Sequence, residues 1–227
     1  MTRGVKAPLF GAIACAAAIA PLAALAYSYG PFKARDLDIL AHLQRETGAL
    51  HDLAAALVNL GDLASLLILG AVIAGIGLHF GRRREVVAAT VLVVGANLTT
   101  QGLKSALEHV RYRAAEHGFE LPWPNSFPSG HTTAAATLAV GLLFVVPARH
   151  RLAAAAIGFL LTAAVGFSVV VLSWHYPSDV LGALLVVGAW AFAILAVLRY
   201  RDERARRDAA VSGGSRRPRG RWAVSTE

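Results

Sequence analysis

The chain has 227 residues, of which 56% are apolar and 16% charged, with a mean hydropathy of +0.54 and a formal net charge of +8. A soluble domain carries roughly 25% charged residues, so this composition disfavours a soluble protein and favours a membrane protein. The single cysteine, Cys15, excludes disulfides within the monomer and cysteine-based metal sites.

Apolar stretches that are long enough to cross a bilayer, which takes about 20 residues each, recur along the chain. They lie at approximately 7–28, 57–80, 86–106, 131–148, 152–173 and 179–198. We therefore expect an all-α, polytopic membrane protein with about six transmembrane helices in one bundle, formed by residues 1–203. Residues 204–227 are rich in Arg, Ser, Gly and Pro and are expected to form a basic, disordered cytoplasmic tail.

The first apolar stretch can be interpreted in two ways. Its basic start and its Ala24-Leu25-Ala26 sequence also fit a cleaved signal peptide. We favour an uncleaved helix, because the stretch is long for a signal peptide and Pro21 interrupts it. The segment 29–56 that follows mixes apolar and charged residues in a pattern typical of an amphipathic helix in the membrane interface.

Basic residues gather at every second junction between the apolar stretches. By the positive-inside rule, we expect these junctions and both termini in the cytoplasm. The connections 29–56, 107–130 and 174–178 then face the periplasm or the exterior. Basic residues at helix ends, rather than on one amphipathic face, favour membrane lipids over nucleic acid as the partner. The basic clusters are Arg3 with Lys6, Arg82 to Arg84, Arg149 with Arg151, and the run from Arg199 to Arg207.

Three blocks of polar residues fall on the outward side. Lys104 and Arg111 are seven residues apart, about two helical turns, so both cations share a face and can clamp a phosphoryl group. The Pro128–His131 sequence offers a hydroxyl, backbone N–H groups and an imidazole at a helix start, which suits an anion. His175 and Asp179 are four residues apart, on one face of a helix turn, where a carboxylate can brace an imidazole.

Each block also has an ordinary structural explanation. Cations at helix ends often snorkel, a Ser-Gly pair can be a plain N-cap, and an interfacial histidine can pair with the next helix. However, capping does not require an imidazole, and three such blocks fall on one predicted face of a charge-poor protein. The pattern therefore indicates chemistry on a phosphate at a membrane surface.

These residues resemble the type 2 phosphatidic acid phosphatase superfamily, which includes lipid phosphate phosphatases, bacterial acid phosphatases and vanadium haloperoxidases. The family pattern is K-x6-R-P, then P-S-G-H, then S-R-x5-H-x3-D. It corresponds here to Lys104–Arg111, Pro128–His131 and Ser168–Asp179. The six-helix layout of the membrane branch matches as well.

The resemblance implies that His175 is the nucleophile and that Asp179 holds its other imidazole nitrogen. It implies that His131 protonates the leaving group and then helps to activate water. The implied phosphate ligands are Lys104, Arg111, Ser129 and Gly130. The resemblance implies no metal and no other cofactor, a lipid phosphate as the substrate, and nothing about the oligomeric state.

Two positions depart from the family pattern. Tyr112 stands where the pattern has Pro, and Val169 stands where it has Arg. The missing guanidinium removes one charge-assisted phosphate contact, which by analogy with an oxyanion-hole donor costs roughly 2–4 kcal/mol of transition-state stabilisation. Arg113, close to Arg111, is a candidate accessory cation.

We therefore expect a membrane phosphatase acting on undecaprenyl diphosphate, phosphatidylglycerophosphate or phosphatidate. Val169 favours an alternative, a catalytically weakened binder of lipid phosphates, although two intact histidines argue against it. A haloperoxidase would use the same anion pocket for vanadate, usually in a soluble protein. A transporter would use intramembrane polar residues. Such residues are Asn59, Asp62, Asn97, Thr99, Thr100 and Gln101.

Overall fold

The computed structural model describes residues 2–43, 48–107 and 125–214, and the regular elements in these ranges are helices. The all-α prediction is therefore confirmed. The elements are α1 (Arg3–Ser28), α2 (Gly30–Leu43), α3 (Ala49–Val58), η1 (Asn59–Gly61), α4 (Leu63–His79), α5 (Arg83–Leu107), α7 (Gly130–Val145), η2 (Ala148–His150), α8 (Arg151–Val171) and α9 (Pro177–Gly214).

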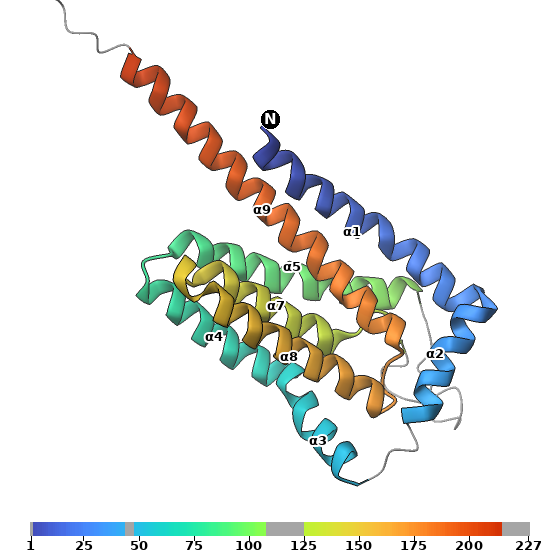
Figure 1. The fold of residues 1–227 in the computed structure, drawn as a ribbon. Helices are drawn as coiled ribbons and strands as arrows, with labels where there is room; N and C mark the ends of the chain where they lie inside the picture. Colours follow the sequence, from blue (N-terminus) through green and yellow to red (C-terminus); the bar gives the residue numbers. More distant parts are fainter. Residues whose placement is uncertain (1, 44–47, 108–124, 215–227) are drawn as a thin grey trace, which may run out of the picture.

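Helix α7 lies at the centre of a bundle in which α4, α5, α8 and α9 surround it (Figure 1). Helix α1 lies outside this bundle and runs along α9 (Figure 1). Small residues allow that close approach. A Cβ added at Gly11 would lie 3.0 Å from the Phe192 ring, and one at Gly188 would lie 3.0 Å from Cys15 Sγ. Cys15 therefore serves in helix packing.

The helices coincide with the predicted apolar stretches. Within the described residues, α1, α5, α8 with η2, and α9 are long and apolar enough to cross a membrane, and the bent pair of Ala49–Gly61 with α4 makes a fifth candidate. Helix α7 is apolar but has 16 residues. It is therefore about 24 Å long, shorter than the hydrocarbon core of a bilayer. The chain is a multi-pass membrane protein.

The second apolar stretch, predicted as a span from 57 to 80, is not one continuous helix. The chain breaks at Asp62, where Ala49–Gly61 and α4 meet at a bend of 57°. Gly61 and Asp62 explain the break, since Gly weakens a helix and Asp favours an N-cap position. The segment 29–56 likewise forms two helices, α2 and α3, rather than one.

The boundary of the predicted tail also needs correction. Residues 204–214 are not disordered, because α9 continues through them to Gly214. Arg, Glu and Ala are strong helix formers, and extending an existing helix needs no new nucleation. Arg204 and Asp208 add an exposed i,i+4 ion pair at 3.9 Å. Residues 215–227 lie outside the described residues.

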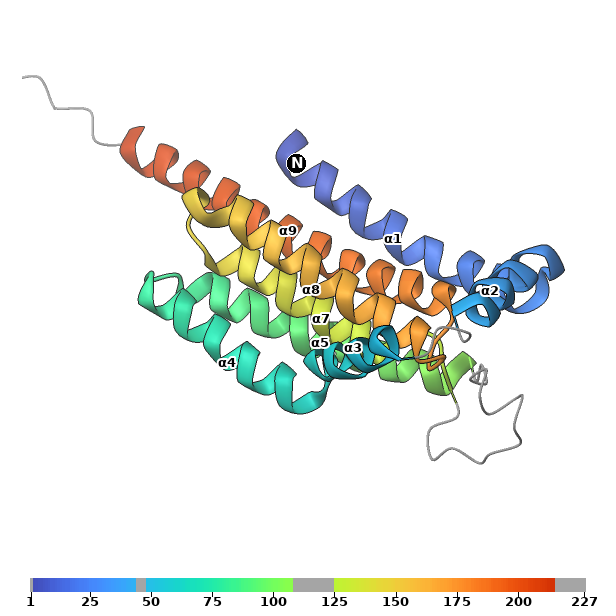
Figure 2. The same cartoon turned by 60° about the horizontal axis from the view of Figure 1, so that its bottom comes forward.

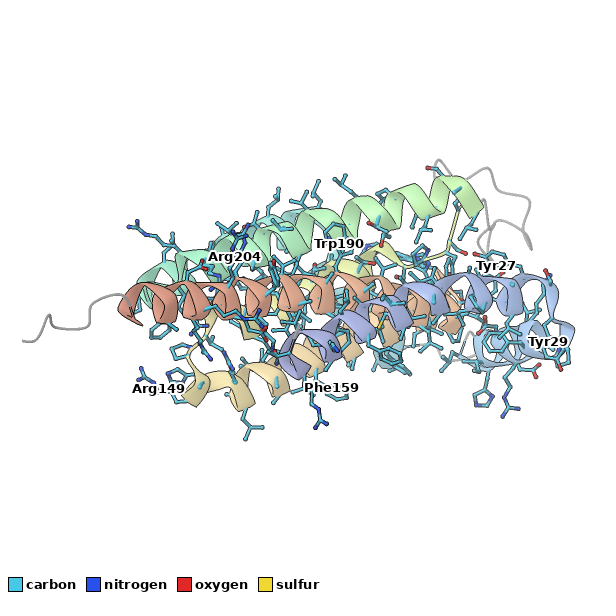
Figure 3. All side chains as sticks on the ribbon, turned by 90° about the horizontal axis from the view of Figure 1, so that it is seen from above. Tyr27, Tyr29, Arg149, Phe159, Trp190 and Arg204 are labelled. Carbon is cyan, nitrogen blue, oxygen red and sulfur yellow. The ribbon has the colours of Figure 1, made fainter. Side chains whose placement is uncertain are left out.

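The two ends of the bundle differ in character. Arg149 and Arg204 lie toward one end of the molecule, and Tyr27 and Tyr29 lie at the other (Figure 3). Helices α2 and α3 and the connection between α8 and α9 lie at the second end as well (Figures 1 and 2). The topology therefore gathers the histidine-bearing motifs at the end opposite the arginine-rich junctions.

Candidate active site

His175 lies in the connection between α8 and α9, and its imidazole is buried against Asp179. Nδ1 lies 3.1 Å from Asp179 Oδ2, and the two side chains are 1% and 0% exposed. An ionised carboxylate only accepts hydrogen bonds, so the imidazole donates from Nδ1 and Nε2 carries the lone pair. The sequence-based pairing of the two side chains agrees with this geometry. The prediction that both lie on a helix turn is wrong, because α9 begins at Pro177.

The start of α9 fixes Asp179. Pro177 occupies the first helical position, and the Asp179 carboxylate accepts a 3.0 Å hydrogen bond from the backbone N–H of Tyr176. This arrangement is the acidic half of a capping box, which satisfies a backbone donor at the helix start. The same carboxylate oxygen thus caps α9 and holds His175, so both groups are ordered by one local structure.

The Pro128–His131 sequence begins α7 as predicted. Ser129 is the N-cap, and its Oγ accepts hydrogen bonds from Thr132 N at 3.4 Å and Thr132 Oγ1 at 3.0 Å. Ser129 N donates to the carbonyl oxygen of Asp179 at 3.0 Å. The two motif blocks are therefore joined directly through the backbone, although about fifty residues separate them.

Lys104 reaches the start of α7 from the last turn of α5. A Cβ added at Gly130 would lie 3.9 Å from Lys104 Nζ and 3.8 Å from Gln101 Nε2. The glycine therefore leaves room for an anion between the helix start and these two donors. Arg111 and Arg113, the other predicted cations, lie outside the described residues.

His131 has a partner that the sequence analysis did not find. Its Nε2 lies 2.9 Å from Asp62 Oδ1, and its ring centroid lies 5.5 Å from that of Trp174. The His131 side chain is 24% exposed and that of Asp62 is 46% exposed, so this pair meets solvent. The signal in the sequence is the Gly61-Asp62 step inside an apolar stretch, but an aspartate there fits an intramembrane polar group equally well.

Val169, which stands where the family pattern has Arg, lies in the last turn of α8. Its side chain is fully buried in an apolar cluster with Leu40, Val58 and Tyr176. Its carbonyl oxygen accepts hydrogen bonds from the N–H groups of Trp174 at 2.9 Å and His175 at 3.1 Å. The residue that replaces the family arginine thus shapes the histidine turn through its backbone.

A second carboxylate, Asp36 of α2, approaches the same helix start. Its Oδ1 accepts a 3.3 Å hydrogen bond from Ser178 N, and the residue is only 6% exposed. Burial is the main cause that raises the pKa of Asp36 above its usual range, and the nearby Asp179 charge adds to this, against the lowering effect of the Ser178 hydrogen bonds. Asp36 therefore ties α2 to the first turn of α9.

The starts of α4, α7 and α9 converge on the two histidines. The dipoles of these helices favour an anion at their starts, and Lys104 adds a full positive charge. In the part of the chain that the structure describes, His, Cys, Asp and Glu side chains form no group of three or more with metal-ligand geometry. The arrangement suits nucleophilic attack on a bound phosphoryl group, with a second imidazole for proton transfer.

Comparisons with known proteins bear on the family and the fold of the chain. A family model described as the PAP2 superfamily matches residues 63–203, more than half of the chain. The fold is similar to that of the crystal structure of a transmembrane PAP2 type phosphatidylglycerolphosphate phosphatase from Bacillus subtilis. The TM-score is 0.70 at 23% sequence identity, over 85% of this chain and 97% of that chain. Curated protein sequences gave no significant match.

Proposed function

Because the chain belongs to the PAP2 superfamily, we propose that it is an integral membrane phosphatase that hydrolyses a lipid mono- or diphosphate through a phosphohistidine. The observation that carries the proposal is the buried His175–Asp179 pair, joined by a backbone hydrogen bond to the Pro128–His131 turn. A binding site alone has no need of a buried, carboxylate-braced imidazole beside a second imidazole.

In the first step, the lone pair of His175 Nε2 attacks phosphorus, and the bond between phosphorus and the leaving oxygen breaks. Asp179 keeps its hydrogen bond to Nδ1–H and stabilises the charge that develops on the ring. His131, as an imidazolium, gives its proton to the leaving oxygen. Lys104, Arg111, Ser129 and the Gly130 N–H hold the non-bridging oxygens.

In the second step, water attacks the phosphohistidine. His131, now neutral, accepts a proton from this water, the phosphorus–nitrogen bond breaks, and inorganic phosphate is released with His175 restored. His131 ends the cycle protonated, ready for the next leaving group. The cycle needs no co-reactant besides water, and positive charge from side chains and helix starts stabilises the transition state.

A groove between α4, α5 and α7 favours a lipid substrate. Its volume is about 470 Å³, and its walls are mostly apolar. Leu67, Val94 and Leu98 line it and are 52–67% exposed, so it opens on the side that faces lipid. Asn97 lies at the groove one helical turn from Gln101. We propose undecaprenyl diphosphate, phosphatidylglycerophosphate or phosphatidate as substrates, the second of which matches the name of the Bacillus subtilis protein.

One observation favours a second candidate, a weakened binder of lipid phosphates. Val169 supplies no cation, and its side chain is enclosed by apolar residues. A protein without that contact can retain phosphate binding while turnover falls, because transition-state charge is less well stabilised.

Phosphate release by the purified protein in detergent separates the two functions. The panel contains the three candidate lipids, and the variants are His175→Ala and His79→Ala, a histidine at the opposite end of the bundle. We expect release from at least one lipid, a loss of at least about 10³-fold in His175→Ala, and no loss in His79→Ala. Phosphate release that survives in His175→Ala contradicts the mechanism. Folded protein that binds these lipids without releasing phosphate favours the binder.

A further inference from the structure

Asp62 occupies a helix-capping position but does not cap its helix. It precedes α4 with an extended backbone (φ −72°, ψ 162°), and its side chain makes no capping hydrogen bond. Aspartate at this position normally accepts from the backbone N–H groups of the first turn. Here its Oδ1 instead lies 2.9 Å from His131 Nε2. The carboxylate is therefore directed at the imidazole rather than at its own helix.

The backbone next to Asp62 is built to approach His131 closely. A Cβ added at Gly61 would lie 2.8 Å from His131 Cβ, 2.9 Å from its carbonyl oxygen and 3.0 Å from its Cα. Only glycine allows η1 to pack this tightly on the first turn of α7. The ring of Trp174 lies near the same imidazole, at a centroid distance of 5.5 Å. Packing, and not the ion pair alone, thus sets the distance between the two side chains.

The two histidine–aspartate pairs differ in their contact with water. The side chains of His175 and Asp179 are essentially inaccessible, whereas those of His131 and Asp62 are 24% and 46% exposed. A nucleophile benefits from a dry environment, while a residue that exchanges protons with water needs access to it. Ion pairs this exposed contribute little to stability, so stability is a weak reason for the contact.

We propose that Asp62 is a positioning residue for His131, an inference that rests on the function proposed above. As a carboxylate, Asp62 accepts the hydrogen bond from Nε2–H and fixes the orientation and tautomer of the ring. Nδ1 is then the atom that exchanges the catalytic proton. It gives its proton to the leaving oxygen as the phosphorus–oxygen bond breaks, and it takes one from the water that attacks the phosphohistidine. The family-model match begins at residue 63, so Asp62 lies outside the matched region.

The test compares leaving groups that differ in their need for a proton. One substrate is phosphatidate, whose leaving alkoxide must be protonated; the other is a lipid-anchored nitrophenyl phosphate, whose leaving group departs as an anion. For Asp62→Asn, we expect kcat on phosphatidate to fall about 10- to 100-fold, as for other groups that orient a catalytic residue. On the aryl substrate we expect a smaller loss in the phosphorylation step, with little change in KM on either. Asp52→Asn, an exposed carboxylate in the first turn of α3, is the matched control.

A double-mutant cycle with His131→Ala completes the test. Since Asp62 acts through His131, adding Asp62→Asn to His131→Ala should cause no further loss. Equal loss on both substrates, additive losses in the cycle, or Asp62→Asn activity equal to that of Asp52→Asn would each overturn the proposal. A wild-type protein without phosphate release, or one that does not depend on His175, would instead refute the proposed function. Thermal melts in detergent verify that each variant is folded.

Discussion

The backbone of Val169 makes hydrogen bonds to the histidine turn, whereas its side chain packs in an apolar cluster. Its carbonyl oxygen holds the N–H groups of Trp174 and His175, a role that any residue can fill. Its side chain is 0% exposed and packs among apolar residues of α2 and α3. The loss of the family arginine is therefore accompanied by an apolar environment that suits valine and not a cation.

Restoring the family residue should consequently damage the protein. We expect Val169→Arg to reduce the free energy of unfolding by on the order of 3 kcal/mol or more, because a guanidinium enters an apolar cluster without a partner there. Val169→Ile is the control and should cost less than about 2 kcal/mol. Thermal melts and phosphate release from phosphatidate measure both effects. A Val169→Arg protein that is as stable as the wild type and more active would show that the side chain reaches the phosphate.

Site residues that belong to a contiguous motif were predictable, and residues that join the site across the chain were not. Ser129, Gly130 and His131 are neighbours in the sequence, and the chemistry of a helix start suggested their use. Asp62 lies 69 residues before its partner His131, and no local pattern connects them. Asp36 looked like one charge of an amphipathic helix, whereas its burial beside Ser178 depends on how α2 docks.

Between helices, glycines decide where backbones and large side chains meet. Gly182 of α9 faces Phe127, which is fully buried and makes an edge-on contact with Tyr27 at a centroid distance of 5.8 Å and an angle of 87°. Gly95 of α5 likewise receives the ring of Trp190, whose Nε1 donates to Thr99 Oγ1 at 3.0 Å. Phe127 thus anchors the turn before Ser129 between α1 and α9.

Adding one methyl group at Gly182 should disturb the site from a distance. Its Cβ would lie 2.5 Å from Cε2 and Cζ of Phe127, so the ring and the adjoining turn must shift. We expect Gly182→Ala to lower the free energy of unfolding by about 1–3 kcal/mol and to reduce phosphate release. Gly75→Ala is the control, since nothing lies within 4 Å of its added Cβ. It should be neutral or stabilise α4 by up to about 1 kcal/mol. Equal melting temperatures for the two variants would contradict this account.

The positions of the helices could be predicted from the apolar pattern. The break at Asp62 and the continuation of α9 to Gly214 could not. Hydropathy reports whether a segment prefers lipid, so each of the six stretches is mostly helical, the second one in two pieces. It is insensitive to a single Gly-Asp step, and the bend at Asp62 was therefore missed. The extension of α9 to Gly214 does not follow from hydropathy either, because the basic composition of this segment lowers its mean hydropathy although Arg, Glu and Ala favour a helix.

Across the whole molecule, charge and chemistry occupy opposite ends. Arg149 and Arg204 mark one end, and Tyr27 and Tyr29 at the end of α1 mark the other (Figure 3). The two histidine–aspartate pairs lie at the starts of α4, α7 and α9, at this second end. Arg84 extends this basic end by donating to Asp202 and to the Leu198 carbonyl. By the positive-inside rule, we therefore expect the basic end in the cytoplasm and the site on the opposite side of the membrane.

Labelling of single cysteines tests this orientation. Cys15 is the one native cysteine, so Cys15→Ala gives a background without thiols. Tyr29 is 54% exposed at the site end, and Arg149 is exposed at the basic end. In intact cells, a membrane-impermeant maleimide should react with the Tyr29→Cys protein and not with the Arg149→Cys protein, which should react only after permeabilisation. The positive-inside rule requires this order, because Arg149 lies beside Arg151 in a short junction between two helices. The reverse order would place the site on the cytoplasmic face, where it would act on lipid phosphates of the inner leaflet.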